Sequence, residues 1–145
     1  MSNLWFRDYS LEEVNAIFAK YMTGFLEIQA TQIESNLLVA QMPVSDRVKQ
    51  PFGLLHGGAS VVLAESVGSV ASNMIIDNTL FAGVGMEVNA NHLHPVNSGI
   101  VSAYCSPLHI GRTSHVWDIR IKDEQQQTVC VSRLTVAIVK KNDNI

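Results

Sequence analysis

Charged side chains are scarce in this sequence, and neither sign of charge forms a run. They make up 16% of the 145 residues, against about 25% in typical soluble domains. Such a charge-poor surface indicates that part of it is buried in a homo-oligomer. Ten basic and 13 acidic residues give a net charge of −3, and no basic cluster could follow a phosphate backbone. We therefore expect a homo-oligomer that does not bind nucleic acid.

Cysteine is also rare, and no targeting segment is expected. Cys105 and Cys130 have no CxxC or Cys/His spacing and lie in apolar segments, where reduced thiols behave as small hydrophobes. Residues 1–9 do not show the basic segment followed by an apolar stretch that is typical of a signal peptide, so none is expected. The most apolar region, residues 54–76, contains His56 and Glu65, which a bilayer span would tolerate poorly. These features favour a cytoplasmic protein that does not enter the membrane.

Two common kinds of catalytic site are missing as well. No Gly-x-Ser-x-Gly motif surrounds a serine, which argues against a Ser-His-Asp hydrolase. His92 and His94 share one face of an expected strand, but no nearby cysteine or third histidine completes a set of metal ligands. We therefore expect neither a metal nor another cofactor.

The spacing of apolar residues predicts one α+β domain over residues 1–145. A chain of this length can bury a core without metal or disulfide support. Helical spacing follows a capping box at Ser10 and ends at Gly24. A longer helix is expected from Gly57 to about Asn78, because strands seldom extend over so many residues.

Segments rich in β-branched and aromatic residues, or with a period of two, predict six strands. Their expected ranges are Phe25–Ile33, Leu37–Val44, Phe81–Val96, Gly99–Pro107, Thr113–Asp123 and Thr128–Lys140. A loop is expected over Ser45–Gly53. Short turns between consecutive strands favour antiparallel pairing. The expected architecture is one antiparallel sheet wrapped around the long helix.

Glu65 is unusual because its helix is otherwise apolar on almost every side. Its surroundings predict substantial desolvation, although a solvent-facing position or a structural hydrogen bond would also explain a single glutamate. Ser69 follows at i+4 on the same face, where its hydroxyl can hold a water. Gly57 and Gly58 would let a ligand approach backbone N–H groups at the positive end of the helix dipole. Such N–H groups can stabilise a carbonyl oxygen that gains negative charge.

The Glu65 carboxylate and the N–H groups at the helix start are too far apart within one chain to act on the same atom. Glu65 lies eight residues beyond Gly57, which corresponds to roughly 12 Å along a helix at about 1.5 Å per residue. Both cannot reach one carbonyl carbon. Two copies of the helix packed antiparallel would bring Glu65 of one chain to Gly57 of the other. We therefore expect a site shared between subunits.

The segment from Gln50 to Ser69, QPFGLLHGGASVVLAESVGS, resembles the signature of hotdog-fold acyl-CoA thioesterases of the 4-hydroxybenzoyl-CoA and phenylacetate-pathway type. The likeness extends from about Gly24 to Val139. It implies a hotdog fold and hydrolysis of an acyl-CoA, preferably an aromatic one, to a free acid and CoA.

The resemblance also implies roles for individual residues. Glu65 corresponds to the family's carboxylate, which acts as nucleophile or general base, and Ser69 to the hydroxyl that supports the attacking water. Gly57 corresponds to the backbone N–H that polarises the thioester carbonyl. Gln50 and His56 correspond to the family's glutamine and histidine near the thioester. The last three would come from the partner chain.

Contacts to CoA are expected at the rim of the sheet. The candidates for its phosphates are His92, His94, His109 and Arg112. The acyl group is expected in an apolar slot lined in part by residues 61–68, whereas the charged nucleotide must lie outside it.

His115 and Trp117 share one strand face, where they either pack in the sheet or line a pocket. Two other functions are compatible with these residues. One is an acyl-thioester hydratase or dehydratase of the same fold, and the other is a non-catalytic acyl-CoA binding module in which Glu65 is structural.

Overall fold

The computed structural model describes residues 2–142, which form an α+β structure. The helices are α1 (Leu11–Phe18), α2 (Tyr21–Phe25), the 3-10 turn η1 (Asp46–Val48) and α3 (Gly57–Ile75). The strands are β1 (Gln29–Ile33), β2 (Leu38–Pro43), β3 (Phe81–His92), β4 (Ile100–Ile110), β5 (Ser114–Lys122) and β6 (Thr128–Lys140).

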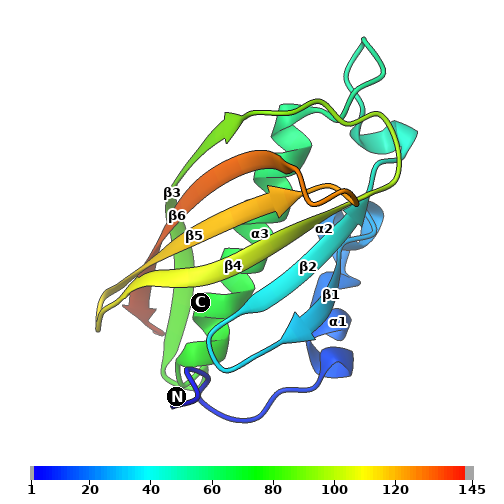
Figure 1. The fold of residues 1–145 in the computed structure, drawn as a ribbon. Helices are drawn as coiled ribbons and strands as arrows, with labels where there is room; N and C mark the ends of the chain where they lie inside the picture. The colour runs from blue at the N-terminus through cyan, green and yellow to red at the C-terminus, as the bar shows by residue number, and fades with distance from the viewer. Residues whose placement is uncertain (1, 143–145) are drawn as a thin grey trace.

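All six strands belong to one antiparallel sheet in the order β1-β2-β4-β5-β6-β3. The sheet curves around α3, and α1 and α2 lie beside the β1 edge (Figure 1). The predicted sheet around a long helix is therefore confirmed. β3 forms the opposite edge, and its outer side pairs with no strand in the part of the chain that the structure describes.

α3 packs on the sheet through one face and leaves the other accessible. Leu63, Ala64 and Val67 are fully buried on the sheet side, where burial of apolar area stabilises the fold. Gly68 lies on the same side, so close to Leu134 of β6 that a β-carbon would come within 2.5 Å of its Cδ2. The Gly68 backbone thus lets the helix approach the sheet.

Some predicted boundaries are wrong. The strand expected to begin at Phe25 is preceded by α2, which includes that residue. Arg47 donates to the Phe25 carbonyl and stacks its guanidinium on the ring at 4.7 Å, so a contact from a distant segment holds Phe25 in the helical turn. β4 continues beyond Pro107, because a bulge between Pro107 and His109 accommodates the missing N–H of the proline.

Cys105 and Cys130 are free thiols in the interior. Burial raises the pKa of both thiols, which keeps them protonated and unreactive. Among residues 2–142, no helix combines the length and apolar character needed to cross a lipid bilayer.

Candidate active site

Glu65 and Ser69 lie one turn apart on the outer face of α3. Both are partly buried, so the deeper desolvation expected for Glu65 is absent from the single chain. The reason is the orientation of the helix, which turns the side with Leu63, Ala64 and Val67 to the sheet. Next to the carboxylate is β3, where a β-carbon at Gly85 would lie 2.8 Å from Glu65 Oε1. The glycine therefore leaves room for the carboxylate.

A groove of about 340 Å³ opens at this carboxylate. It runs between α3 and the two N-terminal helices. Its residues are Ile17, Phe18, Met22, Thr23, Val62, Glu65, Ser66, Ser69 and Val70. The charged and hydroxyl groups of α3 thus lie at one side of a mostly apolar groove, an arrangement suited to a reactive polar group with an apolar extension.

The first turn of α3 presents backbone N–H groups. His56 is the N-cap residue, and its Nδ1 accepts a hydrogen bond from the Gly58 N–H at 2.8 Å. Because Nδ1 accepts this bond, Nε2 is the ring nitrogen that can donate to a ligand. The Gly57 N–H has no acceptor within residues 2–142. It is available to a ligand oxygen at the positive end of the helix.

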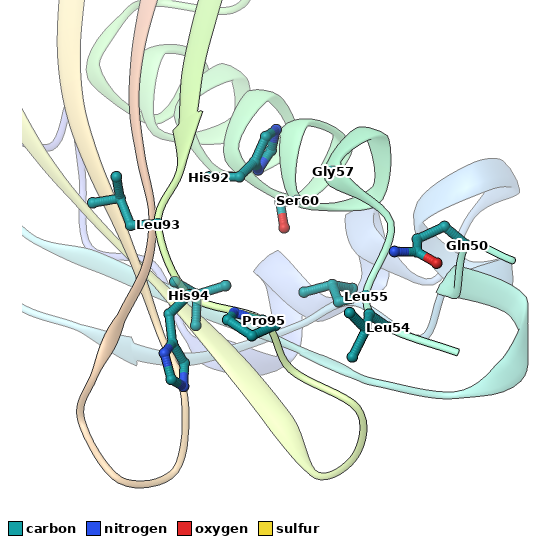
Figure 2. Close-up of a pocket in the computed structure, with 10 residues that line it drawn as sticks. Gln50, Leu54, Leu55, Gly57, Ser60, His92, Leu93, His94 and Pro95 are labelled. Atoms are coloured by element: carbon teal, nitrogen blue, oxygen red, sulfur yellow. The ribbon is translucent and has the colours of Figure 1, made fainter. Parts of the chain in front are cut away.

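A second cavity of about 360 Å³ adjoins this helix start. Figure 2 shows Gln50, Gly57, Ser60 and His92 around it, with the His92 ring against the first turn of α3. A β-carbon at Gly57 would lie 2.7 Å from His92 Nε2. Gln50 is held in its loop, because its Oε1 accepts a hydrogen bond from the Phe52 N–H. Its amide nitrogen remains a potential donor at the cavity.

The structure brings the predicted residues together in two groups. Gln50, Gly57 and His92 line the cavity at the start of α3, with His56 as the adjacent N-cap. Glu65 and Ser69 line the groove further along the same helix. Neither of these two cavities contains both groups. This separation is the one predicted from the length of the helix.

The expected CoA contacts are also divided. His92 pairs with Cys130 at one end of the β3–β6 ladder. His109 lies near the end of β4 and Arg112 in the β4–β5 turn, next to Ser114, which pairs with Ala137 near the other end of β6. His94 points away from α3 (Figure 2). Its Nε2 lies 3.8 Å from Oδ2 of the buried Asp123, so this histidine already has an acidic neighbour.

His115 and Trp117 pack in the interior behind α3. Trp117 Nε1 donates to Ser72 Oγ at 2.8 Å, and Ser72 Oγ lies 3.1 Å from His115 Nδ1. Ser72 Oγ is therefore shared between the indole of Trp117 and the imidazole of His115. Burial lowers the pKa of His115, and the charge of nearby His109 lowers it further. These residues connect α3 to β5 and line neither cavity described above.

Sequence reasoning missed Gly85 and the groove wall formed by α1 and α2. Glycines at positions 83 and 85 in a strand were a possible signal, since strand glycines often mark close approach of another group. Ile17 and Met22, by contrast, have the ordinary spacing of an amphipathic helix. Nothing in that spacing distinguishes the wall of a groove from a core face.

Comparison with known proteins identifies relatives of the whole fold. The Thioesterase superfamily model matches residues 52–130. The chain is 49% identical over 136 residues to the 1,4-dihydroxy-2-naphthoyl-CoA hydrolase of Escherichia coli K12, covering 94% of this chain and 99% of that protein.

Solved structures agree with this match. A mutant thioesterase of Pseudomonas aeruginosa, with one glutamine replaced by alanine, superposes with a TM-score of 0.93 at 46% identity, covering 95% of this chain and 99% of that one. A Staphylococcus aureus protein is represented by two mutants. Its glutamate-to-alanine mutant has a TM-score of 0.81 at 45% identity and covers 83% of this chain and 100% of its own. Its glutamine-to-alanine mutant has a TM-score of 0.77 at 46% identity and covers 79% and 95%.

Proposed function

The chain belongs to the thioesterase superfamily and is a thioester hydrolase of the hotdog fold; from this premise we propose that it hydrolyses an aromatic acyl-CoA, with Glu65 as its central catalytic group. The observation that carries the proposal is the position of Glu65. Its carboxylate lies with Ser69 at the side of an apolar groove, in a space kept open by Gly85. A thioester carbonyl at this point would have its acyl group beside apolar walls.

The mutants of the Staphylococcus aureus protein support the choice of residues. The glutamine replaced in one crystal and the glutamate replaced in the other are separated by the same number of residues as Gln50 and Glu65 are here. We propose that Gln50 and Glu65 occupy the corresponding positions. Both would then belong to one active site, although they line different cavities of the single chain.

We propose that the two groups meet across a two-fold axis. Along β3, Gly85 lies beside Glu65 and His92 lies against Gly57. If two β3 edges pair antiparallel about an axis midway between Gly85 and His92, then Gly85 of each chain lies opposite the partner's His92. The same axis brings Glu65 of each chain to the partner's Gly57. The exposed apolar side chains of β3, including Met86 at 68% exposure, would be covered by this pairing.

In this dimer, catalysis divides between the chains. The partner's Gly57 N–H would hold the carbonyl oxygen as it gains negative charge, with the helix dipole adding to the stabilisation. Glu65 would attack the carbonyl carbon and expel CoA as the thiolate, forming an anhydride. Water would then attack the Glu65 carbonyl carbon of this anhydride, so that the free acid leaves with a Glu65 oxygen and Glu65 keeps the solvent oxygen. Alternatively, Glu65 would deprotonate a water held by Ser69, which attacks instead. A single turnover in ¹⁸O-water distinguishes the routes, because only the first incorporates the label into Glu65.

The substrate we propose is 1,4-dihydroxy-2-naphthoyl-CoA or a closely similar aryl-CoA. The Escherichia coli relative of 49% identity, named as the hydrolase of that compound, supports this choice. Its hydrolysis would place the enzyme in menaquinone biosynthesis. Buried free thiols fit a reducing compartment, so we propose a cytoplasmic location. We also propose a homotetramer built from two of the dimers with shared sites.

A panel of acyl-CoA substrates with a thiol-reactive dye tests the function. Release of thiol from naphthoyl-CoA and benzoyl-CoA, faster than from straight-chain acyl-CoA of similar size, is expected. A change in absorbance of an enoyl-CoA without thiol release would instead indicate a hydratase. Binding without either signal would indicate a non-catalytic module, and both outcomes would contradict the proposal.

A further inference from the structure

The groove at Glu65 continues along α3 into a second apolar space. This distal cavity has a volume of about 210 Å³ and lies further from the helix start. Its residues are Tyr9, Ile17, Ser69, Val70, Asn73, Met74 and Asn78. Ile17, Ser69 and Val70 line both cavities. Ser69 and Val70 belong to α3. Ile17 is therefore the one residue of α1 that lines both cavities.

The wall opposite α3 includes two large apolar side chains that remain exposed. Ile17 is 52% exposed and Met22 is 62% exposed, whereas Val14 of the same N-terminal segment is buried in the core and lines neither cavity. The segment therefore has a core-facing side and a separate apolar side directed at the groove. Exposed apolar walls that converge on a few polar groups are typical of ligand sites.

The acyl group of the substrate is the occupant that this geometry favours, given the proposed function. The thioester carbonyl must lie at Glu65 and Ser69, so the groove begins at the reacting carbon. The CoA moiety carries phosphates, which are too costly to bury between Ile17, Met22 and Val70 without matched cations. Neither cavity wall contains a lysine or an arginine. The acyl group is therefore the part of the substrate that can extend along α3.

We propose that Ile17 determines how large an acyl group the enzyme accepts. An acyl group of one ring would occupy the part of the groove beside Glu65. A second fused ring that extends along α3 would pass Ile17 to reach the distal cavity, whose end is lined by the more polar Tyr9, Asn73 and Asn78. Ile17 acts on specificity through steric contact with the acyl group and takes no part in bond breaking.

The test compares kcat/KM for 2-naphthoyl-CoA with kcat/KM for benzoyl-CoA. In Ile17→Trp the larger side chain should obstruct the distal cavity and lower this ratio at least about tenfold, the scale of discrimination expected from a pocket that differs by a few carbon atoms. Ile17→Ala should raise the ratio. Leu11→Trp is the matched control, because Leu11 lies on the same helix and lines neither cavity; its ratio should equal that of the wild type.

Binding provides a second readout that does not depend on hydrolysis. The analogues are non-hydrolysable because a methylene separates the sulfur from the carbonyl. In each Ile17 variant, the preference for the naphthoyl analogue over the benzoyl analogue, measured as the ratio of their Kd values, should change in the same direction as the kcat/KM ratio. If the wild type binds both analogues and hydrolyses neither thioester, the proposed function fails, and the Kd ratio still tests Ile17. A ratio within about twofold of the wild type in both Ile17 variants, with thermal unfolding unchanged, would overturn the inference. The inference would also be overturned if the Ile17 variants changed the oligomeric state in light scattering and changed kcat/KM equally for both acyl groups. That result would identify the groove as a contact between chains.

Discussion

The Glu65 carboxylate on α3 faces the bare backbone of Gly85 on β3. A β-carbon at position 85 would lie 2.8 Å from Glu65 Oε1, closer than non-bonded atoms can approach. The atom in the way belongs to the mobile end of a side chain, so the carboxylate would move rather than the strand. The absence of a side chain at Gly85 thereby leaves the space that the carboxylate occupies.

Gly85→Ala should therefore lower kcat without unfolding the protein. Displacement of a catalytic group by about 1 Å can cost roughly 100-fold in rate, while the thermal unfolding midpoint should change little. Val84→Ala, at the adjacent exposed position of β3, is the control and should retain activity. Full activity in Gly85→Ala would show that the observed carboxylate position is not the catalytic one.

Glu65→Gln should leave the fold intact and remove nearly all hydrolysis. The amide has the volume of the carboxylate but can neither attack the carbonyl nor accept a proton. Ser69→Ala should lose much less activity, because water can still reach Glu65. Steady-state kinetics of thiol release measures both effects. A Glu65→Gln protein with most of its turnover would exclude the central role assigned to this residue.

The shared site predicts complementation between two inactive chains. The first carries Glu65→Gln, and the second carries Gln50→Ala with His56→Asn, where asparagine preserves the N-cap of α3. A hybrid dimer would contain one site with both defects and one with neither. Mixing under exchange conditions should therefore restore activity. Hybrids verified by native mass spectrometry but without recovered activity would contradict the two-fold arrangement, even if Glu65 is catalytic.

Arg112→Ala should act mainly on KM for CoA thioesters. Arg112 is exposed in the β4–β5 turn, where it would hold a CoA phosphate equally in the ground state and the transition state. KM should rise and its salt dependence should weaken. Hydrolysis of a truncated thioester without the nucleotide should be insensitive to the change. Arg120→Ala, an exposed arginine paired with Asp118, is the control. Equal loss of turnover on both substrates would assign Arg112 to the reacting centre or to the fold.

The burial of His115 predicts that the free energy of unfolding falls in mild acid. Its pKa in the folded protein is lowered from the ordinary value of 6.5 by burial and by His109. Above pH 6.5 both states are neutral at this site. Between 6.5 and the lowered pKa only the unfolded state takes up the proton, so the free energy of unfolding falls as the pH decreases. Each tenfold difference in proton affinity corresponds to about 1.4 kcal/mol.

Urea unfolding at constant protein concentration, at pH 7.5 and pH 5.0, measures this effect. His115→Gln keeps a polar group next to Ser72 but does not titrate, so its unfolding midpoint should decrease less between the two pH values than that of the wild type. Equal decreases in the two proteins would exclude His115 as the source.

Local chemistry in the sequence determined several elements of this protein. The capping box at Ser10 and Glu13 forms as predicted, and β6 has the predicted bounds, Thr128–Lys140. The long helix begins at Gly57 as predicted and ends a few residues earlier than expected, at Ile75. Turn residues, caps and apolar periods act between near neighbours, so their signal is complete in the chain itself. The spacing of Gly57, Glu65 and Ser69 along α3 was predictable for the same reason.

Tertiary contacts decided the remaining features, because they join residues far apart in the chain. Arg47 holds Phe25 in a helical turn, against the strand predicted there. Glu65 is less buried than its apolar neighbours suggested, since the orientation of α3 on the sheet places the carboxylate on the outer face. The approach of Gly85 to Glu65 and the groove wall at Ile17 depend on how β3 and α1 pack around that helix. No period or motif encodes these distances, which result from the packing of whole elements.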